Sequence, residues 1–136
     1  MKPNHLNKSL DELEGVQIIA TQEESTYLVN KVAELRKKRL KYLSIEDLRL
    51  LIGQSISLCY VIPLAIEKLT ENIMAEGDYY EGDLLQNVLS ADKDFWLKNQ
   101  ILKGNLKQLL LTNTKYINSF ITSKKFKDDL NIFLES

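Results

Sequence analysis

The stretch SIEDLRLLIG, residues 44–53, decides the fold class of this chain. Ser44 followed by Asp47 three residues later is typical of a helix N-terminus, where the two side chains bond to each other's backbone N–H groups. After this start the apolar residues recur at spacings of three and four: Ile45, Leu48, Leu51 and Ile52. Gly53 favours an end to the helix. The stretch therefore predicts an amphipathic helix with one buried face.

The same pattern continues on both sides of this stretch. Ser9 with Glu12 predicts a capping box, and Gly15 predicts the end of that first short helix. Pro63 is expected in the first turn of a later helix, because the residue before a proline is biased away from the helical region. Further helices are expected from Ser25 or Thr26 to the basic run at 36–39, from about 83, after Asp92, and over 99–111, 114–122 and 123–134.

Few residues favour β-hairpins, since the chain has five Gly, two Pro and no Asn-Gly or Asp-Gly pair. A length of 136 residues fits one domain. We therefore expect an all-α fold, a compact single-domain bundle of about seven to eight short helices over residues 1–136. The segment Gln22-Glu23-Glu24 is expected to be a loop before the second helix.

Composition indicates a cytoplasmic protein. Cys59 is the single cysteine, so no intramolecular disulfide can form, which favours a reducing compartment. It lies in the apolar stretch Ile56 to Ile66 and is expected to be a core side chain. The N-terminus lacks the apolar stretch of a signal peptide. The run Val61 to Ile66 is far shorter than the roughly 20 residues of a membrane span, so no membrane partner is expected.

The sequence contains no recognisable catalytic constellation. His5 is the only histidine and is expected to be solvated near the terminus, so neither a catalytic triad nor a histidine metal site is predicted. No glycine-rich phosphate loop occurs. The carboxylates of residues 76–83 do not follow the order of a calcium loop, and they are too local for a glycosidase pair. We expect no enzyme activity, no catalytic or metal-binding residues and no cofactor.

Charge is unevenly distributed along the chain, although the net charge is only −1. The segment Glu67–Asp94 holds eight acidic and two basic residues. At its centre, residues 76–82 form the clearest loop, which is either a solvated acidic loop or an acidic, aromatic contact surface. The candidate contact residues are Glu76, Asp78, Tyr79, Tyr80 and Glu81. The basic run Arg36–Lys41 is expected to be a solvated helix end, and a pI near 5.9 argues against direct nucleic-acid binding.

Several motifs in order resemble a known family. They are SLDELE (9–14), YLV (27–29), IEDLRLLIGQ (45–54), IPLA (62–65), and EGDLL (81–85) followed by Phe95-Trp96. As a set they resemble the immunity proteins of bacterial contact-dependent growth inhibition (CDI) systems. The resemblance covers residues 9–96 and leaves 97–136 as a helical C-terminal extension.

The resemblance implies a cytoplasmic antidote in bacterial competition. Such a protein binds and neutralises the toxic C-terminal domain of a CDI effector, its cognate partner, and those toxins are frequently nucleases. A nuclease presents a positive groove to its substrate, so the acidic loop is the predicted toxin contact and the basic C-terminal helices are the second choice. The motif residues themselves are expected to be structural, with Arg49 paired to Asp83.

Two other functions remain open at this point. One is a helical adaptor or regulatory protein that binds a different protein partner. The other is a helix-turn-helix DNA-binding protein, which the short link Leu40–Ser44 between two predicted helices permits and the charge opposes.

Overall fold

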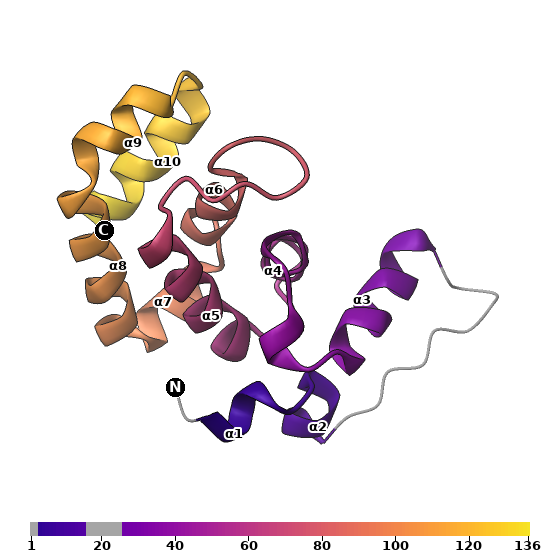
Figure 1. Cartoon of the computed structure of the whole chain (residues 1–136). Helices are drawn as coiled ribbons and strands as arrows, with labels where there is room; N and C mark the ends of the chain where they lie inside the picture. Colours follow the sequence, from indigo (N-terminus) through magenta and orange to yellow (C-terminus); the bar gives the residue numbers. More distant parts are fainter. Residues whose placement is uncertain (1–2, 16–25) are drawn as a thin grey trace.

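The computed structural model describes residues 3–15 and 26–136, and the regular elements among these residues are helices, with no β-sheet (Figure 1). The all-α expectation is confirmed. The elements are α1 (Pro3–Leu6), α2 (Leu10–Glu14), α3 (Tyr27–Lys37), the 3-10 turn η1 (Leu40–Tyr42), α4 (Ile45–Gly53), α5 (Leu58–Glu71), α6 (Asp83–Leu89), α7 (Lys93–Lys98), α8 (Gln100–Thr112), α9 (Thr114–Phe120) and α10 (Lys124–Glu135). The loop expected at residues 22–24 lies outside the described residues.

Helix α4 lies at the centre and packs against α5 and α6. Its N-terminus has the predicted capping box, in which Ser44 Oγ accepts the Asp47 N–H at 3.0 Å and Asp47 Oδ2 accepts the Ser44 N–H at 3.0 Å. Leu48 and Leu51 on its inner face are buried with Leu85 of α6. The stretch that decides the fold class from the sequence therefore forms the middle of the core.

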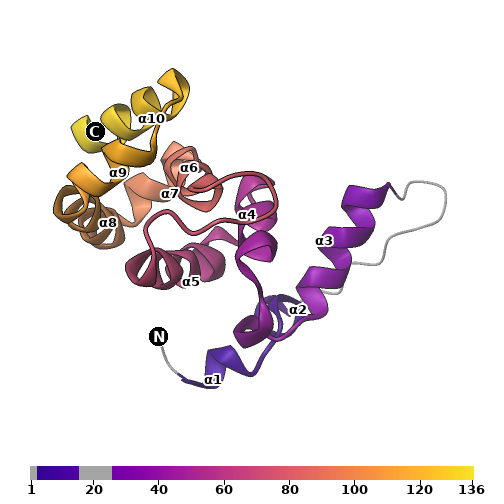
Figure 2. The same ribbon diagram turned by 45° about the horizontal axis from the view of Figure 1, so that its top comes forward.

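The C-terminal helices α8 to α10 share this core. Their buried side chains join the same hydrophobic cluster as those of α4 to α6: Leu106, Leu110, Ile117, Phe126, Leu130 and Phe133. Figures 1 and 2 both show α8, α9 and α10 grouped beside α5 to α7. Removing the C-terminal segment would uncover apolar surface on α5 and α6.

Helix α3 stands apart from the other helices in both views and contacts mainly α2 (Figure 2). Thr26, one of the two expected N-cap candidates, caps it by accepting the Val29 N–H at 3.2 Å. The first turn is exposed, with Tyr27 at 80%. The last turn is anchored through Arg36, which is only 4% exposed and pairs with Asp11 and Glu14 of α2. The expectation of a solvated basic run is therefore wrong for Arg36.

Helix α5 differs from the prediction in two ways. It begins at Leu58, after Ser57 in a left-handed conformation (φ 50°), so Pro63 lies in its second turn and not its first. Cys59 is exposed and not a core residue. The reason is that this apolar stretch is one continuous helix, which buries Val61 and Ile62 but turns Cys59 outward with Glu67.

His5 also differs from its predicted position. It lies in the single-turn helix α1, and its ring meets that of Tyr60 edge to face at 5.9 Å between centroids. It therefore packs against α5 and is not merely a solvated terminal residue.

Candidate functional site

The loop between α5 and α6 is closed on itself at its base. Gly82 N–H donates to the Met74 carbonyl at 3.1 Å, and Glu76 and Glu81 form an isolated antiparallel bridge. Gly82 has φ +87°, a left-handed conformation that disfavours other residues, and a Cβ there would lie 2.6 Å from Met74 Cε. The loop therefore enters α6 through a turn that requires glycine.

Two carboxylates beneath the loop hold its backbone. Asp83, which is 1% exposed, accepts the Gly77 N–H at 2.7 Å through Oδ1 and the Tyr79 N–H at 3.1 Å through Oδ2. Glu46 of α4 accepts the Asp78 N–H at 2.9 Å. A Cβ on Gly77 would lie 2.6 Å from Glu46 Oε1, so this close approach depends on glycine. Three successive backbone N–H groups of the loop are thereby fixed to α4 and α6.

Arg49 completes this arrangement and neutralises part of its charge. Its Nε and Nη2 donate to the two oxygens of Glu46 at 2.6 and 2.5 Å, and its Nε lies 4.0 Å from Asp83 Oδ2. The hydrogen bonds from Arg49 lower the pKa of Glu46, although burial opposes this. The structure thus brings Arg49 and Asp83 together at the limit of an ion pair, while the direct hydrogen bonds of Arg49 go to Glu46.

Glu46 is the residue that the sequence analysis missed. Its position three residues before Arg49 on the same helix is a usable signal, because residues at this spacing are neighbours on a helix surface. No sequence signal connects Glu46 to Asp78, which lies 32 positions away.

The five candidate contact residues all carry exposed side chains. Glu76, Asp78 and Glu81 are exposed, and Tyr79 and Tyr80 are 69% and 45% exposed. The Tyr79 ring lies against the Arg49 guanidinium, with 4.4 Å from Cζ to the ring centroid. The Tyr80 hydroxyl hydrogen-bonds to Gln86 Oε1, and burial raises its pKa. The loop therefore combines a fixed backbone with outward acidic and aromatic groups.

Hollows flank the loop on two sides. One, of about 270 Å³, lies between α3 and α4 and is lined by Tyr27, Glu46 and Asp78 among others. The second, of about 480 Å³, is lined by Tyr80, Glu81 and residues of α9 and α10. Concave surface beside an exposed acidic loop suits the insertion of side chains from a protein partner.

Neither a metal-binding cluster nor an activated cysteine is found in the described part of the chain. Within residues 3–15 and 26–136, no three His, Cys, Asp or Glu side chains form a group that could hold a metal ion. Partial burial, and then the charge of Glu14, raise the pKa of the Cys59 thiol, which disfavours the reactive thiolate. None of the helices in the described ranges has the length and apolar character that crossing a bilayer requires.

Comparison with protein-family models gives a match that includes the candidate site. A family model described as CDI immunity proteins matches residues 12–106. No curated protein matches the chain. The matched segment begins within α2 and ends within α8, so it contains α4, the loop and Asp83. Helices α9 and α10 follow it.

Proposed function

The chain belongs to the family of CDI immunity proteins, and from this premise we propose that it binds and neutralises the toxic C-terminal domain of a CDI effector in the cytoplasm. The toxin that fits its charge best is a nuclease. The observation that carries this choice is the outward-facing loop Glu76–Glu81, whose backbone is fixed by Glu46 and Asp83.

Charge supports a nuclease as the partner. Glu76, Asp78 and Glu81 are all exposed on one short loop. A nuclease has a positive groove for its phosphate substrate, so a negative loop accelerates encounter and selects the correct orientation. Exposed ion pairs alone contribute little affinity, roughly 0–1 kcal/mol each.

Aromatic contact area and a fixed backbone supply the binding affinity that the exposed charges do not. Tyr79 is exposed yet held against Arg49, so it offers a large contact surface with little freedom left to lose on binding. The backbone hydrogen bonds from Gly77, Asp78 and Tyr79 keep the loop in one conformation before binding. Pre-organisation of this kind reduces the entropy cost of association.

The experiment uses the C-terminal domain of a large surface protein encoded beside this gene, with stopped-flow association and growth protection as readouts. The double variant Asp78→Lys/Glu81→Lys should slow association, most of all at low salt, where screening is weakest. The control Glu67→Lys/Glu135→Lys makes the same charge change at two exposed positions outside the loop. Tyr79→Ala should speed dissociation and leave the association rate nearly unchanged.

Two results would contradict the proposal in different ways. If that toxin domain neither binds the parent protein nor is neutralised by it, the proposed function is wrong. If the parent protects and both loop variants protect equally well, the function stands and the loop is not the interface. In that case the basic C-terminal helices are the next surface to test.

A further inference from the structure

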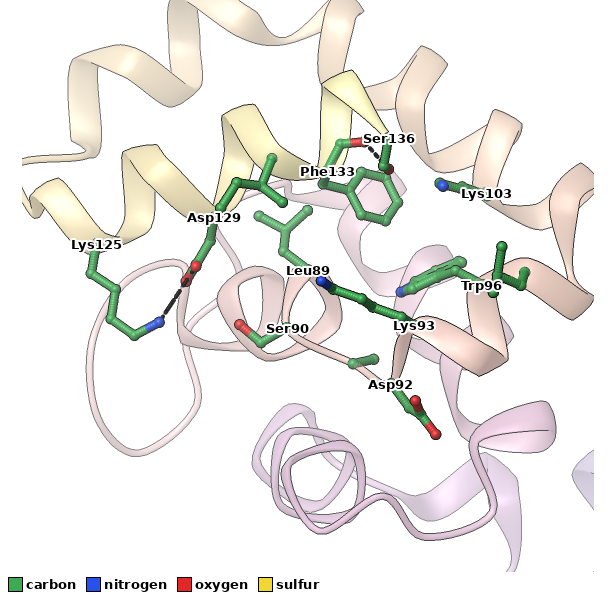
Figure 3. Close-up of a pocket in the computed structure, with 13 residues that line it drawn as sticks. Leu89, Ser90, Asp92, Lys93, Trp96, Lys103, Lys125, Asp129, Phe133 and Ser136 are labelled. Atoms are coloured by element: carbon green, nitrogen blue, oxygen red, sulfur yellow. Dashed lines mark hydrogen bonds and ion pairs between the residues drawn. The ribbon is translucent and has the colours of Figure 1, made fainter.

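A cavity of about 560 Å³ lies between α6, α7 and α10, and none of its lining residues belongs to the acidic loop (Figure 3). The rings of Trp96 and Phe133 meet edge to face in its wall, with centroids 5.1 Å apart. Leu97 and Ile132 also line it, although they are 65% and 59% exposed. Its size and mainly apolar lining are those of a small-molecule site.

A buried hydrogen-bond donor in this wall has no acceptor. Trp96 is 4% exposed, and in the described part of the chain no group accepts the hydrogen of its Nε1. Buried polar groups are paired in the great majority of cases, so an orphaned donor beside a cavity points to an acceptor on a ligand. Lys93 lies one helical turn before Trp96 on α7, and both side chains line the cavity.

The charges around the Trp96 end of the cavity favour an anion. Lys93 and Lys103 both line it, and neither forms an ion pair within residues 3–15 and 26–136. The third lysine, Lys125, is paired with Asp129 at 3.1 Å. Asp92 accepts the N–H of Asp94, and Figure 3 shows its carboxylate directed away from Trp96.

We propose that this cavity binds a small amphiphilic carboxylate. Its apolar body packs against Trp96 and Phe133 between Leu97 and Ile132. Its carboxylate lies between the ammonium groups of Lys93 and Lys103 and accepts the Trp96 N–H. The flexible Lys93 side chain rotates toward the bound carboxylate. Part of the cavity comes from α10, which follows the segment matched by the family model, and none of its lining residues belongs to the acidic loop, so the site is separate from the proposed toxin contact.

The chain itself supplies the reporter for a test, because Trp96 is its only tryptophan. The full-length protein is titrated with hydrocinnamate and, separately, with hydrocinnamamide, which has the same body without the charge. Hydrocinnamate should change the Trp96 fluorescence to saturation and bind about tenfold more tightly than the amide, since charged partners strengthen hydrogen bonds. The Trp96 indole N–H resonance should move downfield at the same concentrations.

Two variants assign the preference to named groups. Lys103→Gln should remove most of the difference between the two probes, whereas Lys98→Gln, an exposed lysine of α7 that does not line this cavity, should keep it. Trp96→Phe should weaken hydrocinnamate binding about tenfold by calorimetry and weaken amide binding less, because the amide oxygen accepts a weaker hydrogen bond than the carboxylate. If Trp96→Phe fails to fold, Lys103→Gln decides the question.

Three results would overturn the inference. Equal affinity for both probes would show an apolar cavity without an anion site. If neither probe binds, small amphiphilic carboxylates are excluded as the ligand. A change in the Trp96 signal on addition of the toxin domain, with no response to the probes, would assign the cavity to a partner side chain.

Discussion

The substitution Arg36→Met should loosen the attachment of α3. Arg36 is 4% exposed, and its guanidinium donates to Asp11 Oδ1 at 2.8 Å, to Glu14 Oε1 at 2.5 Å and to Ser57 Oγ at 2.9 Å. Burial works against this charge, yet the two carboxylates raise the pKa of Arg36 on balance. Methionine keeps most of the apolar stem of the side chain and removes the charge and all three hydrogen bonds.

The size of the effect follows from what remains behind. Removing one partner of a buried ion pair costs about 3–5 kcal/mol, because the other charge stays buried without compensation. The side chains of Asp11 and Glu14 keep 12% and 28% exposure, so water relieves part of that loss. We therefore expect the free energy of unfolding to fall by about 3 kcal/mol, near the lower end of that range. For a chain of this length that is a fall of about 10 °C in Tm.

Urea denaturation and native-state hydrogen exchange measure this prediction. The urea midpoint of Arg36→Met should be lower than that of the parent. The substitution should also accelerate amide exchange more in α2 and α3 than in α4 to α6, because α3 contacts mainly α2. Lys37→Met is the matched control, since Lys37 is the exposed neighbour on the same helix. Equal midpoints for the two variants would refute the reasoning. They would mean that the buried Arg36 contributes no more to stability than the exposed Lys37.

Three further predictions concern stability. Leu51→Ala should cost about 2–5 kcal/mol in urea denaturation, because Leu51 is fully buried; a loss below about 0.5 kcal/mol would mean that the site repacks freely. Burial raises the pKa of Asp47, but hydrogen bonds from Lys38 and Ser44 lower this pKa on balance below its unfolded value near 3.8. The ionised Asp47 therefore contributes its full stabilisation above that value and loses it as pH falls through the lower folded pKa. Asp47→Asn should flatten the decline in Tm between pH 5 and pH 2, and an unchanged slope would contradict this prediction. Gly104→Ala should stabilise the protein by about 0.5–1 kcal/mol, because a Cβ there enters open space within α8. Gly82→Ala should destabilise it by about 1–3 kcal/mol, because Gly82 has φ +87°. Thermal melts in which both variants shift Tm in the same direction would contradict the assigned backbone geometry.

Helix boundaries were predictable wherever a local signal sets them. Ser9 and Ser44 cap the helices that the sequence assigns to them, and Thr26, one of two candidates, caps α3. A cap depends only on residues within one turn. Pro63 was misplaced because proline is compatible with a helix start, and nothing local shows that the helix begins earlier. Cys59 was misplaced because an apolar run does not specify which of its faces points inward.

The position of the candidate site could be predicted from the sequence, but the contacts that hold its backbone could not. Composition alone located the acidic, aromatic loop, since its residues are adjacent in sequence. The carboxylates that fix its backbone come from α4 and α6, and such contacts follow only from the tertiary arrangement. Arg36 illustrates the same limit: the sequence shows a basic run, while its buried partner Glu14 lies 22 positions away.

On the proposal that this loop contacts the toxin, the way in which its backbone is held bears on how toxin specificity changes. Its anchoring bonds use the backbone N–H groups of Gly77, Asp78 and Tyr79, which every residue except proline provides. Side chains at positions 78 and 79 can therefore be exchanged without altering the bonds that shape the loop, while Gly77 and Gly82 cannot. On that same proposal, a lineage diversifies the contact residues one mutation at a time, each intermediate remains folded, and recognition keeps pace with a changing toxin.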